Sequence, residues 1–123
     1  MTKQRKKLGS EAERIAARYL AKHGLKIIEF NHRNKIGEID LICREAGLFI
    51  IVEVKAKTGT GRGSPEEMVD RRKQRKLIRT AEGYFMLNEI EDPDWRIDVV
   101  AVEYNDFGGY KINWLKSAVE EWG

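Results

Sequence analysis

The sequence is poor in cysteine and has no apolar run long enough to span a membrane. Its one cysteine, Cys43, excludes a disulfide within the chain and indicates a reducing compartment. The basic N-terminal stretch MTKQRKKL is not followed by the apolar region of a secretory signal. We therefore expect a cytoplasmic protein without a membrane partner.

What the chain does contain is a large apolar fraction and an excess of basic charge. Hydrophobic residues make up 41% of the 123 positions, which excludes a disordered chain and allows a substantial core. Charged residues make up 35%, the net charge is +3 and the pI is about 9.0, so an anionic partner is favoured. With no internal repeat and no linker, we expect a basic N-terminal arm over residues 1–8 and a single domain over residues 9–123.

Apolar periodicity and turn residues predict the element order α β β β α β β. The first helix is expected over residues 10–23, where Ser10 and Glu13 fit a capping box. A second helix is expected over residues 64–88, with Ser64 as its cap. Strands are expected over residues 25–31, on both sides of a turn at residues 46–47, and over residues 95–104 and 110–114. A short helix over residues 116–122 is expected to end the chain.

The turn at Ala46-Gly47 joins two runs of period two, which predict a β-hairpin. The turn glycine is expected to supply the positive φ that such turns need. This turn sets a register in which Asp40 faces Glu53 and Glu38 faces Lys55.

Two ionised carboxylates that lie opposite each other, about 5 Å apart, repel by roughly 3 kcal/mol at an effective dielectric of about 20. A divalent cation between them, or a shared proton, would remove this cost. Because Lys55 projects to the same side, Asp40, Glu53 and Lys55 form a candidate site. Alternatively, both carboxylates splay into solvent and Lys55 pairs with Glu38. The apolar residues on both faces of these strands favour the site, since such strands are usually covered on both sides.

The second predicted helix combines an apolar face with a dense positive field. Extending the apolar face toward the N-terminus by helical spacing reaches Lys73 and Gln74, so these groups turn toward whatever the apolar half packs on. Other basic residues of this helix have no acidic residue four positions later, so contact with phosphate explains them at least as well as a solvated face does. They are Arg71, Arg72, Arg75, Lys76 and Arg79.

The segments Gly37–Ile42 and Val52–Lys55 resemble those of the YraN-like family, small bacterial proteins placed in the PD-(D/E)xK, or restriction-endonuclease-like, superfamily. The resemblance covers most of the chain and implies a mixed central β-sheet flanked by helices. Glu13 is also similar in its spacing to the helical glutamate of archaeal Holliday-junction resolvases. Further residues that share the resemblance are Asn31, Arg33, Gly63, Pro65, Val69, Lys73, Arg96, Asp98, Val99 and Val100.

The resemblance implies a metal site. Asp40 and Glu53 would bind Mg²⁺ or Mn²⁺, Glu13 would complete the ligands, and Lys55 would orient the attacking water. Glu13 thus has two competing interpretations, as part of this site and as part of the capping box.

If the protein acts on DNA, the helix residues supply contacts with the nucleic acid. Lys73 and Gln74 would touch the phosphate beside the site, and the helix arginines would touch flanking phosphates. Lys57 stands where the family often has arginine, and Arg62 stands where it often has an aromatic residue. We count both among the candidate nucleic-acid contacts.

The sequence therefore predicts a metal-dependent DNA endonuclease. The alternatives are a non-catalytic nucleic-acid-binding or complex-forming protein on the same fold, and a small structural partner that docks on an acidic protein. Branched and linear DNA both remain open as substrates, as do the monomer and the homodimer.

Overall fold

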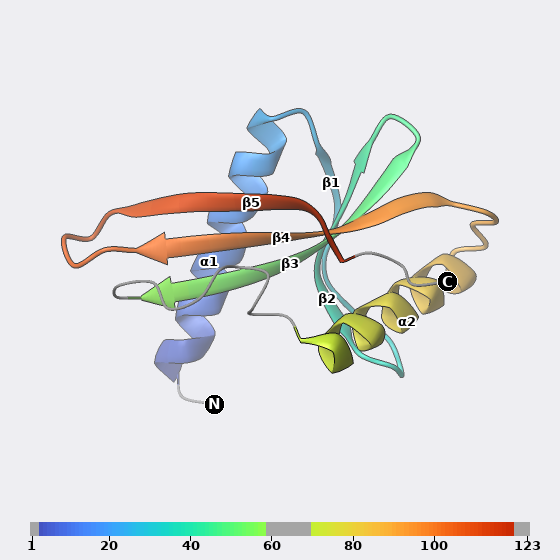
Figure 1. Ribbon diagram of the computed structural model, residues 1–123, viewed down its shortest axis with the longest axis horizontal. Coiled ribbons are helices and arrows are strands. Elements are labelled where there is room, and N and C mark those ends of the chain that lie inside the picture. The colour runs from blue at the N-terminus through green and yellow to red at the C-terminus, as the bar shows by residue number, and fades with distance from the viewer. Residues whose placement is uncertain (1–2, 59–69, 120–123) are drawn as a thin grey trace.

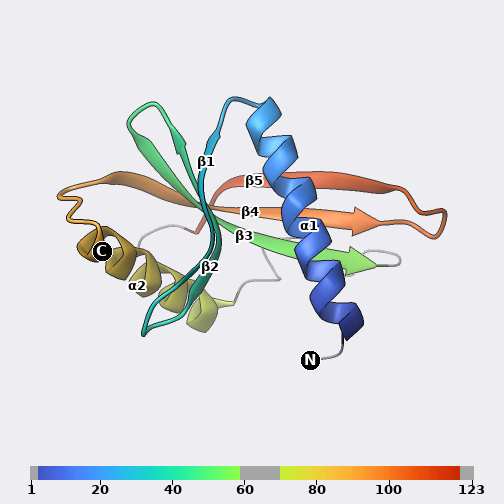
Figure 2. The same ribbon diagram turned by 180° about the vertical axis from the view of Figure 1, so that it is seen from behind.

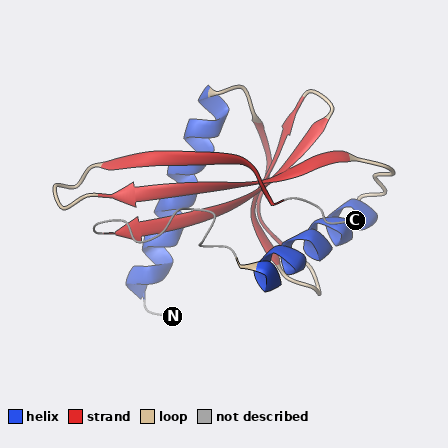
Figure 3. Cartoon of the chain, viewed as in Figure 1, coloured by secondary structure: helices blue, strands red, loops and turns tan. Residues whose placement is uncertain are grey.

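A five-stranded mixed sheet carries one helix on each face (Figures 1 and 2). The computed structural model describes residues 3–58 and 70–119. The predicted order α β β β α β β is confirmed (Figure 3). The elements are α1 (Lys3–Lys22), β1 (Lys26–Arg33), β2 (Glu38–Glu45), β3 (Leu48–Thr58), α2 (Arg71–Leu87), β4 (Asp94–Tyr104) and β5 (Tyr110–Val119). Among the described residues, no helix has the length and hydrophobicity needed to cross a bilayer.

The strands lie side by side in sequence order. The pairs β1–β2, β2–β3 and β4–β5 are antiparallel, whereas β3 and β4 run parallel from Leu48 and Asp94 to Thr58 and Tyr104. A parallel pair needs a crossover connection, and α2 lies within it. This crossover brings α2 back across the sheet, next to β2.

Alternate residues of the central strands feed two apolar layers, as expected for strands covered on both faces. On one face, α1 packs on Leu41, Ile50 and Val52. On the other, α2 packs on Ile42 and Ile51. The helix residues in these layers include Ala16, Ala17 and Leu20 of α1, and Leu77, Ala81, Tyr84 and Phe85 of α2.

The turn of the β2–β3 hairpin lies where the sequence predicts it. Glu45 pairs with Leu48, as the register requires. The turn residue with a positive φ is Ala46, at 54°, so the expectation that Gly47 adopts this conformation is wrong. The apolar pattern of both strands, rather than the turn glycine, therefore determines the register.

Both helix starts differ from the prediction. Helix α1 begins at Lys3, so the stretch assigned to a separate arm is already helical from that residue. Lysine, arginine, glutamine and leucine are strong helix formers, and they extend α1 past Ser10. Ser10 therefore lies inside the helix, where its Oγ accepts a hydrogen bond from Arg14 at 3.4 Å, and the capping box is wrong.

Helix α2 begins at Arg71 rather than near Ser64. Asp70 caps it, because its Oδ1 accepts a hydrogen bond from the backbone N–H of Lys73 at 2.9 Å. Ser64, the predicted cap, lies outside the described residues.

The expected C-terminal helix is wrong over residues 116–119, because β5 continues to Val119. The cause is Asp98, a fully buried residue of β4. Its carboxylate accepts hydrogen bonds from Trp114 Nε1 at 2.9 Å, the Ser117 N–H at 2.8 Å and Arg96 Nε at 2.9 Å. Ser117 has a positive φ of 53°, and the pairing of β4 with β5 shifts register on either side of Asp98. The buried carboxylate thus holds an irregular strand against β4.

Replacing Asp98 with alanine would leave a partly buried guanidinium, an indole and a backbone N–H without their acceptor. We expect Asp98→Ala to lower the free energy of unfolding by about 3–5 kcal/mol. Urea denaturation measures this change, with the exposed Asp106→Ala as the control. A loss no larger than that of the control would contradict the structural role of Asp98.

Candidate active site

The candidate site lies where β2 and β3 separate. The paired residues end with Leu41 opposite Val52, so the predicted ladder pairs Asp40–Glu53 and Glu38–Lys55 do not form. Instead, Asp40 Oδ2 accepts a hydrogen bond from the backbone N–H of Val54 at 2.7 Å. The side chain thus takes the place of a ladder partner, and the strands diverge around it.

Asp40 and Glu53 nevertheless lie side by side, as their spacing predicts. Glu53 is only 8% exposed, and it forms a hydrogen bond with Asp40. Burial and the neighbouring charge of Glu53 raise the pKa of Asp40 to about 8. At neutral pH without a metal, the two carboxylates are therefore held together by a proton on Asp40.

Two lysines flank the carboxylate pair. Lys55 Nζ lies 3.4 Å from Glu53 Oε1, and Lys73 Nζ of α2 lies 3.7 Å from the same oxygen. The alternative pairing of Lys55 with Glu38 does not occur, since Glu38 Oε2 lies 3.3 Å from Arg33 Nε. Both cations therefore face the acidic pair.

The two lysines lie close to each other, and their pKa values shift in opposite directions. Burial, followed by the neighbouring Lys73, lowers the pKa of Lys55. Burial also acts to lower the pKa of Lys73, but the contact with the less basic amine of Lys55 and the charges of Glu53 and Asp40 outweigh it, so the pKa of Lys73 is raised. Lys73 is thus the stronger holder of positive charge in the pair.

Glu13 reaches the site from α1. Its side chain is hydrogen-bonded to Asn31 and to Asp40, and burial raises its pKa. Because Ser10 lies within α1 and caps nothing, the capping-box interpretation of Glu13 is wrong, and the side chain lies beside the candidate site.

A cavity of about 260 Å³ opens beside the carboxylates. The β1–β2 connection borders it and is fixed to α2, where Asn34 Nδ2 donates to the carbonyl of Thr80 at 3.0 Å. A Cβ on Gly37 would lie 2.8 Å from Thr80 Oγ1, so this close approach requires glycine. The lining residues are Glu38, Asp40, Glu53, Lys73, Lys76, Leu77 and Thr80.

Thr80 was not predicted from the sequence, although a signal exists. It stands seven residues after Lys73, which places both on one side of α2. Its Oγ1 donates a hydrogen bond to the carbonyl of Lys76 at 2.7 Å, so the hydroxyl has a partner within the helix. The Thr80 side chain also lines the cavity.

The other predicted nucleic-acid contacts divide into three groups. Lys76 lines the cavity, and Gln74 is partly buried on the same helix. Lys57 lies near the end of β3, opposite Glu103 of β4, and Arg62 lies outside the described residues. The four arginines of α2 do not lie in the cavity but are exposed along the helix: Arg71, Arg72, Arg75 and Arg79.

The donor set suits a hard divalent cation, although no closed metal centre is present. Within residues 3–58 and 70–119, no three His, Cys, Asp or Glu side chains are placed to hold one ion together. Glu13 contacts Asp40, and Asp40 contacts Glu53, so the carboxylates form a chain. Asp40 and Glu53 supply the oxygen ligands that Mg²⁺ and Mn²⁺ prefer, provided that the shared proton leaves.

The fold and the site define a class of small mixed α/β protein with an acidic, lysine-flanked cluster where two central strands diverge. Residues 12–102 match the model of the uncharacterised protein family UPF0102. The chain belongs to this family, also called the YraN family, as its sequence predicts.

Relatives match over most of the chain. A UPF0102 protein of Aliivibrio fischeri (strain MJ11) is 43% identical over 97% of both chains. Another from Persephonella marina is 41% identical over 80% of this chain and 84% of the relative. Among solved structures, Pyrococcus furiosus SfsA in complex with Ca²⁺ is similar at a TM-score of 0.41 and 18% identity, over 94% of this chain and 65% of SfsA.

The raised pKa of Asp40 predicts a pH-dependent stability. The folded protein keeps a proton that the unfolded chain releases, so its stability should fall as pH rises from 3.8 to about 8 and then level off. Asp40→Asn cannot titrate, and its stability relative to the parent should grow over the same interval. Thermal melts without divalent metal measure the difference, with the exposed Glu82→Gln as control. If the stabilities of the parent and of Asp40→Asn depend on pH in the same way, the raised pKa of Asp40 is contradicted.

Proposed function

We propose that this protein hydrolyses phosphodiester bonds of DNA with the help of Mg²⁺ or Mn²⁺. The observation that carries the proposal is the pair of buried Glu53 and partly buried Asp40, which lie beside a cavity and are faced by two lysines. Two adjacent carboxylates destabilise a sheet that has only a structural role. In metal-assisted hydrolysis of a phosphodiester, by contrast, carboxylates bind the metal and nearby cations stabilise negative charge. The resemblance to the restriction-endonuclease-like superfamily points to the same chemistry.

Asp40 and Glu53 would hold the cation, and Glu13 would act through its hydrogen bond to Asp40. The bound metal would supply Lewis-acid polarisation of the scissile phosphate. Before a cation binds, Asp40 must release its proton, and the N–H of Val54 then continues to orient its carboxylate.

Lys55 and Lys73 would stabilise the negative charge that develops during hydrolysis. Their ammonium groups are already positioned by Glu53, so little reorganisation is needed. Because burial lowers the pKa of Lys55, that amine also gives up a proton more readily than an exposed lysine. When it is neutral, the Lys55 amine can accept a hydrogen bond from a water molecule and so orient it, whereas the ammonium form only donates.

The exposed arginines of α2 would contact phosphates that flank the cut. Arg72, Arg75 and Arg79 follow one side of the helix at spacings of three and four residues. Contacts of this kind hold DNA without reading its sequence, so branched and linear DNA are both candidate substrates.

Metal binding should stabilise the fold by linkage. At a Mn²⁺ concentration one hundred times the Kd, the gain is about 2.7 kcal/mol, seen as a higher melting temperature. Asp40→Asn should abolish the gain, because it removes a charged ligand, while the exposed Glu45→Gln should keep it. A melting temperature of the parent protein that does not change in millimolar Mn²⁺ would argue against the site.

The function is tested by cleavage of plasmid, flap and four-way-junction DNA in Mn²⁺. We expect Lys55→Met to slow cleavage by about 10²–10³-fold, because it removes an interaction made mainly in the transition state. DNA affinity, measured in Ca²⁺, should barely move. Glu38→Gln is the control, since Glu38 pairs with Arg33 instead of Lys55.

Two results would overturn the proposal. If Lys55→Met and Glu38→Gln leave cleavage equally unchanged, Lys55 is structural. If the parent protein binds all three DNAs but cleaves none, the protein is a non-catalytic nucleic-acid-binding protein on this fold.

A further inference from the structure

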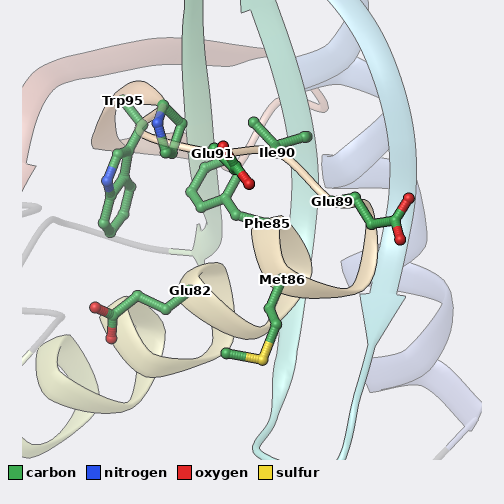
Figure 4. Close-up of a pocket in the computed structure, with 8 residues that line it drawn as sticks. Glu82, Phe85, Met86, Glu89, Ile90, Glu91 and Trp95 are labelled. Carbon is green, nitrogen blue, oxygen red and sulfur yellow. The ribbon is translucent and has the colours of Figure 1, made fainter.

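A second hollow lies at the C-terminal end of α2, away from the candidate active site (Figure 4). It is an open groove of about 700 Å³, here called the acidic groove. It is lined by Glu82, Phe85, Met86, Glu89, Ile90, Glu91, Pro93 and Trp95. The α2 residues of the groove and those of the active-site cavity form two separate stripes of the helix, with no residue in common.

The groove has an apolar floor that is partly open to solvent. The rings of Phe85 and Trp95 meet edge to face at 5.4 Å. Met86 is 81% exposed on the groove, and its neighbour Leu87, which is not among the lining residues, is 67% exposed. A contiguous apolar surface of this kind, unlike a single exposed side chain, is typical of a binding surface.

The rim of the groove is acidic. Figure 4 shows Glu82, Glu89 and Glu91 around Phe85 and Met86. The lining contains no lysine, arginine or histidine, and Asp92 of the adjoining loop and Asp94 at the start of β4 are close to it in sequence. This is a concentrated negative field on a chain whose net charge is +3. DNA phosphates would be repelled from it, whereas a basic partner would be attracted.

Stability does not explain this charge. Carboxylates near the C-terminal end of a helix oppose its dipole, and the last turn of α2 has no basic residue to compensate. Glu89 also has a positive φ of 55°, and the Ile90 N–H donates to the carbonyl of Phe85 at 2.9 Å, as in helix ends that usually have glycine there. Glu89 thus opposes the helix dipole and stands where glycine is usual. An acidic residue in such a position points to a use in binding.

We propose that the acidic groove binds a basic amphipathic helix of a partner protein. One apolar side chain of that helix would enter between Met86 and Trp95, and flanking lysines or arginines would face Glu82, Glu89 and Glu91. Helices of this kind bind in grooves through apolar anchors spaced by three and four residues. The proposal does not depend on the nuclease activity, because the groove shares no residue with the active-site cavity.

The probe is a fluorescently labelled helical peptide with leucines on one face and lysines on the other. Its controls are a peptide with every lysine replaced by glutamate and a scrambled peptide of the same composition. We expect the parent protein to bind only the amphipathic basic peptide, with an affinity that falls as salt is added. NMR shift perturbations should fall within residues 82–95 and leave Asp40 and Lys73 unchanged.

Two pairs of variants locate the binding. Glu82→Lys with Glu91→Lys should weaken binding by about tenfold or more, since several rim pairs each contribute modestly. Glu45→Lys with Asp106→Lys changes two exposed acids elsewhere by the same charge and should leave binding within about twofold. Met86→Ser should weaken binding more than Leu87→Ser, because only Met86 lines the groove.

Several outcomes would overturn the proposal. They are failure of the parent to bind the basic peptide, equal losses in the two charge-reversal variants, and shift perturbations outside the groove. Loss of DNA affinity in Glu82→Lys with Glu91→Lys would assign the surface to DNA. A parent dimer that this variant dissociates, seen by sedimentation, would assign it to a second copy. Because peptide binding is measured without metal or DNA, an absence of nuclease activity does not bear on it.

Discussion

The repulsion between the largely buried carboxylates of Asp40 and Glu53 is the constraint on which the structure around the site depends. Asp40 and Glu53 stand where β2 and β3 stop pairing, and the Val54 N–H that a ladder would use is given to Asp40. A proton on Asp40 and the two lysines offset the charge, to which Glu13 adds a third carboxylate. Each of these compensations is also a group that phosphodiester chemistry can use, which is why the same cluster supports the proposed function.

Asp98 shows what a buried aspartate looks like when it serves structure alone. It receives three N–H donors, from a guanidinium, an indole and the backbone, and it is fully buried. Asp40 receives one backbone N–H and has carboxylates as its other neighbours. The difference lies in the partners and not in the burial. Such surroundings leave Asp40 available for a cation, whereas both oxygens of Asp98 already accept hydrogen bonds from the protein.

Helix α2 connects the parts of the molecule that face outward. As the crossover between parallel strands it must lie across the sheet, and its N-terminal half brings Lys73 and Lys76 to the active-site cavity. Its apolar C-terminal half, with Glu82 and with Glu89 and Glu91 of the following segment, lines the second groove. One helix thus presents surfaces of opposite charge. Electrostatics would direct phosphates to the first and basic partners to the second, so both could be engaged at once.

Local pattern in the sequence determined the element order, the hairpin register and the candidate set of Asp40, Glu53, Lys55 and Lys73, because strand and helix periods assign residues to faces without knowledge of the fold. It failed where competing local signals had to be weighed. The capping motif at Ser10 was outweighed by helix formers before it, and the C-terminal strand depends on donors to Asp98, a residue that lies far from it in sequence. Only the tertiary structure decided between the two interpretations of Glu13, the separation of β2 from β3, and the acidic groove. Each of these arises between elements brought together by packing, and no spacing along one element encodes such a contact.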